Sequence, residues 1–276
     1  MTDTSASLNE AEYLRDKTRF NQRLEEAFQN SDFLSFEPPS EWALGYAEMK
    51  DLLNRNRSPE KQWIKLQVTG PGTVWRSFFS KEVRENLTTP VRIHLRRILL
   101  ASGLAQIQRI HLHGRSPVLV IDDPFFLEDV QGLKEMIPVS KKAGAKVGLH
   151  VCSPLADCGI LKELELDLFH FDLRLWRGTA SNNLFLDQFL KEGGRIALGM
   201  VPTSPGDRFP VSDFPFFLED RLGGLQKRGW SLTEVLKQSL LAPACGTGML
   251  TPAEDREVTQ GLLQAAEELK NSFFHG

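Results

Sequence analysis

The feature that most constrains the fold of this chain is an alternation of short apolar runs with longer amphipathic stretches. Seven runs are predicted to be strands, at residues 33–36, 64–68, 118–122, 147–151, 168–171, 196–200 and 240–242. Stretches with helical spacing of apolar residues lie between them, at 42–54, 91–110, 126–143, 155–164, 183–192 and 214–228. Short strands that alternate with helices indicate βα units and a parallel sheet.

The expected architecture is a single α/β domain over residues 1–276, of the TIM (β/α)₈-barrel type. Residues 1–30 are predicted to be an N-terminal helical segment that a capping box at residues 7–10 opens, and 31–276 hold the βα units. A closing helix is expected from Thr251-Pro252. Seven strands are one short of a barrel, so either one strand is unrecognised or the first is lacking. An open doubly wound sheet is the alternative, although the dinucleotide-binding pattern Gly-x-Gly-x-x-Gly is absent.

Composition narrows the class of protein. The net charge of −3 gives no electrostatic basis for binding nucleic acid or an anionic membrane. Residues 1–7 lack the pattern of a secretory signal, and no run approaches the roughly 20 apolar residues of a membrane span. Three cysteines cannot all pair within the chain, which favours a reducing compartment. These features predict a soluble cytoplasmic protein.

The strongest chemical signal is His150-Val151-Cys152 at the end of a predicted strand. Side chains two apart on a strand point to the same face, so His150 and Cys152 can aim a nitrogen and a sulfur at one point. Asp172 ends another predicted strand, and Cys245 follows the last one. Imidazole, thiolate and carboxylate bind Zn²⁺, and ligands from separate strand ends favour a catalytic site over a structural one. The competing interpretation is that the cysteines and His150 are ordinary core residues.

Three other segments follow predicted strands, where barrel enzymes carry their active sites. Asp122 and Asp123 can hold an ammonium group or act in acid–base chemistry, but they also fit a turn and a helix N-cap, which is favoured for Asp123. Thr69 and Gly70 open a glycine-rich segment that either lets a substrate approach the backbone or makes a tight turn. Thr203 belongs to a hydroxyl pair after residues 196–200, with a structural role as the alternative.

Taken together, these segments resemble the barrel superfamily of cobalamin-independent methionine synthase and uroporphyrinogen decarboxylase. The similarity is greatest to the catalytic barrel of the synthase and its short single-barrel relatives, and it covers residues 60–270. Four segments carry it in the family's order: Thr69-Gly70-Pro71-Gly72-Thr73 (similar to TGPxT), Ile121-Asp122-Asp123-Pro124 (IDEP), His150-Val151-Cys152 (HxC) and Pro243-Ala244-Cys245-Gly246 (PDCG). Asp172 stands where the family has a glutamate ligand.

The resemblance implies a zinc-dependent methyltransferase-like enzyme that activates a homocysteine-like thiol and methylates it from a methylfolate or a methylcorrinoid. It implies that Asp122 holds the substrate amino group, and that a corrinoid protein or a second chain is a partner. The implied zinc ligands are His150, Cys152, Asp172 and Cys245, and the further substrate-binding candidates are Asp123, Thr69, Gly70 and Thr203. Two alternatives stay open: a metal-free decarboxylase-like barrel with an arginine-lined cleft, and a truncated, non-catalytic binding or regulatory barrel.

The sequence departs from the family at two places. The family's opening strand, with its Gly-Ser-x-Pro segment, has no counterpart here, which agrees with the count of seven predicted strands. The histidine of the family's Asp-x-His-Ser-Pro segment is also missing near Pro202-Thr203-Ser204-Pro205. A proton-handling role for that histidine therefore does not carry over to this chain.

Overall fold

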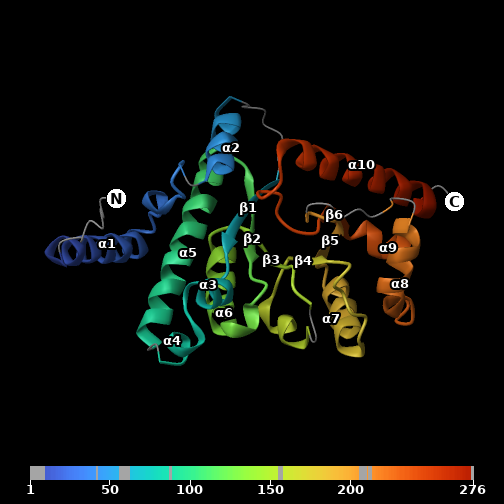
Figure 1. Ribbon diagram of the computed structural model, residues 1–276, viewed down its shortest axis with the longest axis horizontal. Coiled ribbons are helices and arrows are strands. Elements are labelled where there is room, and N and C mark those ends of the chain that lie inside the picture. Colours follow the sequence, from blue (N-terminus) through green and yellow to red (C-terminus); the bar gives the residue numbers. More distant parts are fainter. Residues whose placement is uncertain are drawn as a thin grey trace, which may run out of the picture.

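The computed structural model describes residues 10–41, 43–55, 63–86, 89–154, 158–204, 210 and 213–274. Within these residues, six parallel strands pair in the order of the sequence and curl into a half-barrel (Figure 1). They are β1 (Trp63–Thr69), β2 (Ser116–Asp122), β3 (Lys146–Val151), β4 (Leu168–Asp172), β5 (Arg195–Val201) and β6 (Ser239–Pro243). The α/β class and the parallel sheet are confirmed, and the described strands form part of a barrel.

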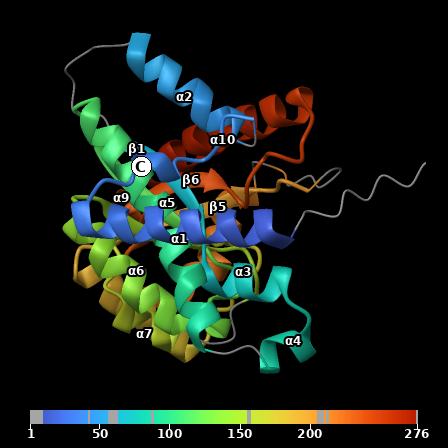
Figure 2. The same ribbon diagram turned by 90° about the vertical axis from the view of Figure 1, so that its left-hand side faces the viewer.

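Helices pack on the outer face of the sheet. α5 packs on β1 and β2, α6 on β3, α7 on β5, and α9 and α10 on β6. Figure 2 shows α1 lying across α5, which it contacts. The helices are α1 (Glu10–Asn30), η1 (Leu34–Phe36), α2 (Leu44–Arg55), α3 (Pro71–Phe78), α4 (Lys81–Asn86), α5 (Thr89–Leu112), η2 (Phe126–Glu128), α6 (Val130–Lys142), η3 (Gly159–Leu164), α7 (Ala180–Lys191), α8 (Phe214–Gln226), α9 (Leu232–Lys237) and α10 (Pro252–Phe274).

The predicted strand at residues 33–36 is wrong, because this segment forms the short 3-10 helix η1. Phe33 is buried and packs edge-to-face on Phe28 of α1. The Asp32 carboxylate accepts a hydrogen bond from the backbone N–H of Leu34 at 3.3 Å, which favours a turn. Periodicity alone cannot separate a short apolar strand from a short helical segment.

The predictions for the helices have mixed outcomes. The stretch predicted at 155–164 contains the 3-10 helix η3, and its residues 155–157 lie outside the described residues. Residues 7–9 of the predicted capping box also lie outside them. α3 starts at Pro71, inside the glycine-rich segment for which the sequence left a tight turn open. α10 begins at Pro252 as predicted.

The register of the sheet brings polar residues into one layer. Thr69 pairs with Asp122, Asp122 with His150, and His150 with His170. Paired residues of parallel strands point to the same face. The intervening residues Val68 and Leu119 point the other way, toward α5, where a Cβ on Gly103 would contact both. The layer therefore lies on the face of the sheet opposite α5.

Asp123 points away from that layer and caps α3. Its fully buried carboxylate accepts hydrogen bonds from the backbone N–H of Gly72 (3.0 Å) and Thr73 (2.7 Å), and from the Thr73 hydroxyl (2.8 Å). A Cβ on Gly70 would lie 2.3 Å from the Asp123 Cβ, and one on Gly72 would lie 2.2 Å from the Phe125 carbonyl oxygen. The glycine-rich segment is thus required by this packing. Asp123 caps the helix before it, whereas the sequence indicated the helix after it.

Asp123→Ala is expected to lower the free energy of unfolding by about 3 kcal/mol, because two backbone N–H groups and a hydroxyl lose a buried, charged acceptor. Chemical denaturation followed by circular dichroism measures the change. Asp51→Ala on the exposed face of α2 is the control, with an expected change below about 0.5 kcal/mol. Unchanged stability of Asp123→Ala would contradict the capping role.

Candidate metal centre

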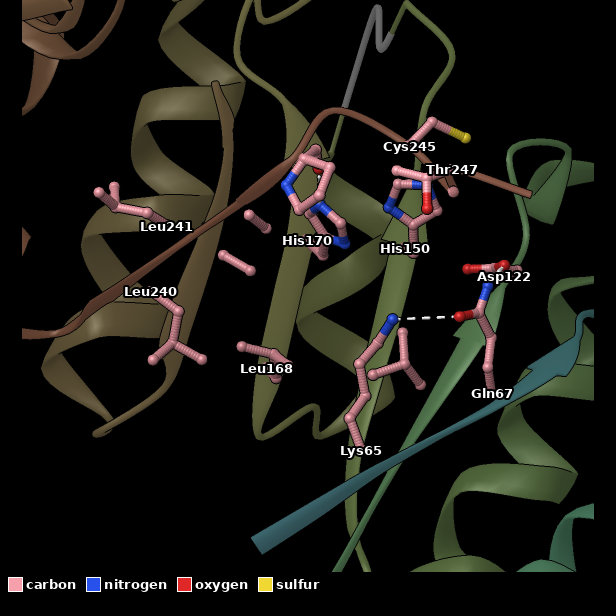
Figure 3. Close-up of a pocket in the computed structure, with 15 residues that line it drawn as sticks. Lys65, Gln67, Asp122, His150, Leu168, His170, Leu240, Leu241, Cys245 and Thr247 are labelled. Atoms are coloured by element: carbon pink, nitrogen blue, oxygen red, sulfur yellow. Dashed lines mark hydrogen bonds between the residues drawn. The ribbon is translucent and has the colours of Figure 1, made fainter. Parts of the chain in front are cut away.

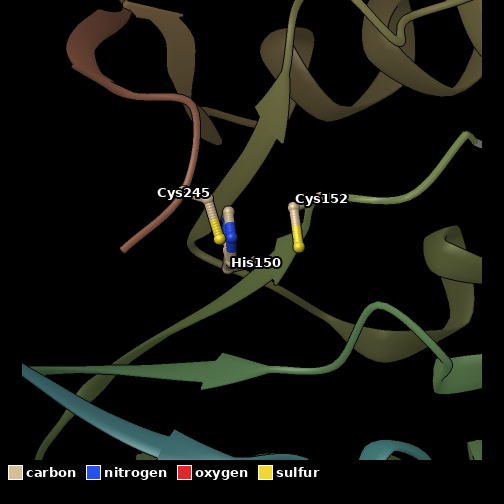
Figure 4. Close-up of side chains that lie close together, drawn as sticks. All are labelled: His150, Cys152 and Cys245. Carbon is tan, nitrogen blue, oxygen red and sulfur yellow. The ribbon is translucent and has the colours of Figure 1, made fainter. Parts of the chain in front are cut away.

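Three of the predicted ligands, His150, Cys152 and Cys245, meet at the carboxyl end of the sheet (Figure 4). Their ligand atoms all lie within 4.8 Å of one another. The side chain of His150 is 4% exposed, and both cysteines are half-buried. A tetrahedral ion with nitrogen and sulfur ligands about 2.0–2.3 Å away spaces those ligands by roughly 3.3–3.8 Å. Small side-chain rotations therefore suffice to close the three residues around a metal ion.

The His150 ring has the surroundings of a ligand. Both of its ring nitrogens are buried, and neither has a hydrogen-bond partner within the described structure. A buried imidazole without a partner loses its hydrogen bonds to water and gains nothing in exchange. A metal ion on one of these nitrogens removes that cost, so the donor set fits a metal site.

The two cysteines shift each other's pKa in opposite directions. The neighbouring Cys152 side chain is the main reason that the pKa of Cys245 is held well below its usual range, and the His150 ring lowers it further. The Cys245 side chain, with burial, raises the pKa of Cys152. Cys245 therefore has thiolate character at neutral pH, and the thiolate is the form of cysteine that binds metals.

Cys245 reaches the centre because the segment after β6 lies tightly against β5. The backbone N–H of Ala244 donates to the carbonyl of Val201 at 2.8 Å. A Cβ on Gly199 would lie 2.9 Å from the Ala244 Cα and 2.8 Å from the Phe171 carbonyl oxygen. Glycine at position 199 thus permits the close approach that brings Cys245 beside β3.

His170 on β4 packs against His150 and contacts the segment that carries Cys245. The sequence analysis did not identify it as a site residue. Its ring centroid lies 4.1 Å from that of His150, and its Nε2 lies 3.0 Å from the Pro243 carbonyl oxygen. Burial first, and then the charge of His150, lowers the pKa of His170 to about 3, so the ring is neutral. Because a carbonyl only accepts, Nε2–H is the donor. The alternation of His170 with buried Phe169 and Phe171 was the signal that it shares a face with Asp172.

The structure does not bring the fourth predicted ligand, Asp172, into the cluster. Arg174 holds both oxygens of its carboxylate. The backbone N–H and the Nε of Arg174 donate to Oδ1 at 2.9 and 3.1 Å, and Nη2 donates to Oδ2 at 2.8 Å. A carboxylate with both oxygens in a buried ion pair is a poor candidate for a metal ligand, because the arginine would lose its partner.

Asp122 lies beside the cluster on β2. Gln67 on β1 donates its amide N–H to Oδ2, whereas Oδ1 is buried and has no partner within the described structure. Burial raises the pKa of Asp122, and the charge of His150 opposes that shift. One oxygen of this carboxylate is therefore held in place, and the other is left without a hydrogen bond among the described residues.

Asp122 and His150 line a cleft of about 470 Å³ (Figure 3). Its other lining residues are Lys65, Gln67, Val120, Leu168, His170, Ala197, Leu240, Leu241, Ala242, Pro243, Cys245, Gly246 and Thr247. The sequence analysis missed Lys65 and Gln67, although their alternation with buried Leu66 and Val68 marks them as facing away from α5.

The remaining predicted substrate-binding residues do not line this cleft. Thr69 is exposed at the end of β1, beside Asp122 in the register. Thr203 is half-buried after β5. Gly70 and Asp123 belong to the packing around the start of α3. Their roles are therefore separate from those of the cluster residues, and for Gly70 and Asp123 they are structural.

Fold and site together define a parallel α/β half-barrel with a candidate His/Cys metal centre at the carboxyl ends of its strands. The sequence matches no protein-family model and no curated protein with which it was compared. Among the described residues, no helix has the length and apolar character that crossing a lipid bilayer requires.

Protein purified without chelator is expected to hold about one metal ion per chain, because three ligands converge on one point. His150→Ala and Cys245→Ser are each expected to lose the ion, as measured by inductively coupled plasma mass spectrometry. Cys158→Ala is the matched control, since Cys158 is fully buried and lies outside the cluster. Full metal content in both ligand variants would refute the site.

His170→Phe is expected to weaken metal affinity by about 10- to 100-fold, because it keeps an aromatic ring against His150 but loses the hydrogen bond to the segment that carries Cys245. Competition with a chromophoric chelator measures the affinity. Asp172→Asn is expected to leave the affinity nearly unchanged, since Asp172 is bound to Arg174. The reverse ranking of the two variants would make Asp172 the fourth ligand.

Proposed function

We propose that the protein is a zinc-dependent, methyltransferase-like enzyme that activates a homocysteine-like thiol and methylates it from a methylfolate or a methylcorrinoid. The observation that carries the proposal is the convergence of His150, Cys152 and Cys245 at the edge of a cleft. Catalytic zinc sites have three protein ligands and an open fourth position, whereas structural sites have four protein ligands. The engagement of Asp172 with Arg174 supports an open fourth position here.

The donor set supports zinc over the hard cations. Two thiolates and an imidazole are soft or borderline ligands, which suit zinc, whereas calcium and magnesium prefer oxygen ligands. The unpartnered ring nitrogens of buried His150 agree with this choice. The expected order of affinities is therefore zinc far above magnesium, and a direct metal titration distinguishes the two.

The residues around the cleft have separate tasks in this proposal. A bound zinc ion would keep the thiol of the substrate ionised at neutral pH. His150, Cys152 and Cys245 fix the point at which that sulfur is held. The unpartnered Oδ1 of Asp122 accepts a hydrogen bond from the substrate ammonium group, while Gln67 holds Oδ2. The sulfur forms its bond to the methyl carbon as the bond between methyl and donor breaks, and the electron pair of that bond leaves with the donor.

The resemblance of four segments to the methionine synthase barrel supports the same proposal. The segments around Asp122, His150 and Cys245 contribute side chains to one cleft. The fourth segment, at residues 69–73, spans the end of β1 and the start of α3, beside Asp123. A corrinoid protein that delivers the methyl group, or a second chain, belongs to the proposal as a partner.

One observation favours a second candidate function, a non-catalytic binding barrel. Among the described strands, β1 and β6 each have a single neighbour, so the half-barrel has two edges at which another chain can pair. The decarboxylase-like alternative has less support, because none of the described residues that line the cleft is an arginine.

Zinc-loaded protein is expected to convert homocysteine to its S-methyl thioether with either methyltetrahydrofolate or methylcobalamin, as measured by mass spectrometry. Asp122→Asn is expected to raise KM for the thiol by about 10-fold or more, because an ammonium group loses its charged partner. Asp51→Asn is the exposed control. Failure of the zinc-loaded protein with both donors, beside a stable zinc site, would favour the binding barrel.

A further inference from the structure

We propose that the cleft takes a small ligand with an anionic group, and that Lys65 on β1 is the residue that recognises this group. The inference deepens the proposed function and rests on it for the thiol end of the ligand. The ligand class is therefore a small thiol that also carries a carboxylate or a similar anion. Lys65 is a specificity-determining residue in this proposal and takes no part in metal binding.

Lys65 and Gln67 lie on the face of β1 that lines the cleft. The ammonium of Lys65 donates to the amide oxygen of Gln67 at 3.1 Å, and Gln67 in turn donates to Asp122. Figure 3 shows the Lys65 amine directed toward Gln67, with Asp122 and His150 bordering the same space. A chain of polar contacts thus runs from the metal centre to a positive charge.

Lys65 has no direct anionic partner in the protein. Its hydrogen-bond partner is a neutral amide, and it forms no ion pair with any residue that the structure describes, although at longer range its charge opposes the burial that raises the pKa of Asp122. Lys146, at the start of β3 in the same sheet, is 3.8 Å from the carboxylate of Asp167. The unpaired ammonium in the cleft contrasts with this neutralised one, and a ligand anion supplies the missing partner.

Lys65 is exposed, but its side chain lines the cleft and not the outer surface of the protein. Inward-facing residues of a closed barrel pack in apolar layers, and a charge there has no room. In this half-barrel the inner face of β1 borders a cleft of about 470 Å³, with apolar walls that include Val120, Leu168 and Leu240. This volume lies in the range of small-molecule sites, in which a few polar groups among apolar walls fix the orientation of the ligand.

The test uses three small probes on the full chain: 3-mercaptopropionate, its neutral analogue 3-mercaptopropanol, and glutarate, an anion without a thiol. Isothermal titration calorimetry measures their dissociation constants with metal-loaded and metal-free protein. The variants are Lys65→Met, which keeps length but removes charge, Lys65→Arg, which keeps charge, and Lys146→Met as a matched strand lysine outside the cleft. Metal content is measured for each protein.

The expected result is that 3-mercaptopropionate binds at least about 10-fold more tightly than 3-mercaptopropanol, which is the effect of one charged hydrogen bond. This preference disappears in Lys65→Met and persists in Lys65→Arg and Lys146→Met, and all variants keep their metal. Binding of both thiols weakens when the metal is removed.

Two other outcomes are decisive. If the anions, glutarate included, bind with a Lys65-dependent preference that is the same with and without metal, the anion site stands and thiol activation fails. If wild-type protein shows no preference for the anionic probes, or Lys65→Met keeps the preference, the proposed role of Lys65 is overturned whatever the metal does.

Discussion

The register of the parallel sheet is the constraint on which the candidate site depends. It aligns Asp122, His150 and His170 in one layer on the face opposite α5. A slip by one residue in any strand would turn that side chain toward the helices. Burial of the alternate residues, such as Leu149 and Phe169, therefore fixes the position of the polar ones. The packing of apolar residues that have no chemical role therefore positions the polar residues of the candidate site.

The same alternation divides two adjacent aspartates between structure and function. Asp123 turns toward α3 and satisfies its first backbone N–H groups, whereas Asp122 faces the cleft with one unpartnered oxygen. Gly70 and Gly72 are needed for the packing of Asp123 against the start of α3, and Gly199 is needed to bring Cys245 close to β3. Resemblance of a glycine-rich or acidic segment to a family motif therefore does not by itself separate a packing role from a ligand-binding role.

Much of the fold was predictable because the strands are short apolar runs with clear helical stretches between them, and because His150 and Cys152 share a strand face by spacing alone. The rest depends on side-chain contacts that the apolar pattern does not reveal. Asp172 is bound by Arg174, which lies only two residues further along, but the pattern of apolar residues says nothing about this ion pair, and Asp172 therefore looked as good a ligand as the others. His170 lies between two phenylalanines, so the sequence alone indicates an ordinary core residue. A ligand-binding role for Lys65 can be inferred only once the inner face of the half-barrel is known to border a cleft.

The candidate centre joins the middle of the sheet to its edge. Two ligands come from β3 and its end, and the third follows β6, which pairs only with β5 among the described strands. An ion held by all three spans β4 and β5 and ties the last strand to the third. Without it, β6 is held by its ladder to β5 and by the packing of α9 and α10. A bound ion would add a link between β3 and the segment that follows β6, and amide exchange in β6 would then be slower with the ion than without it.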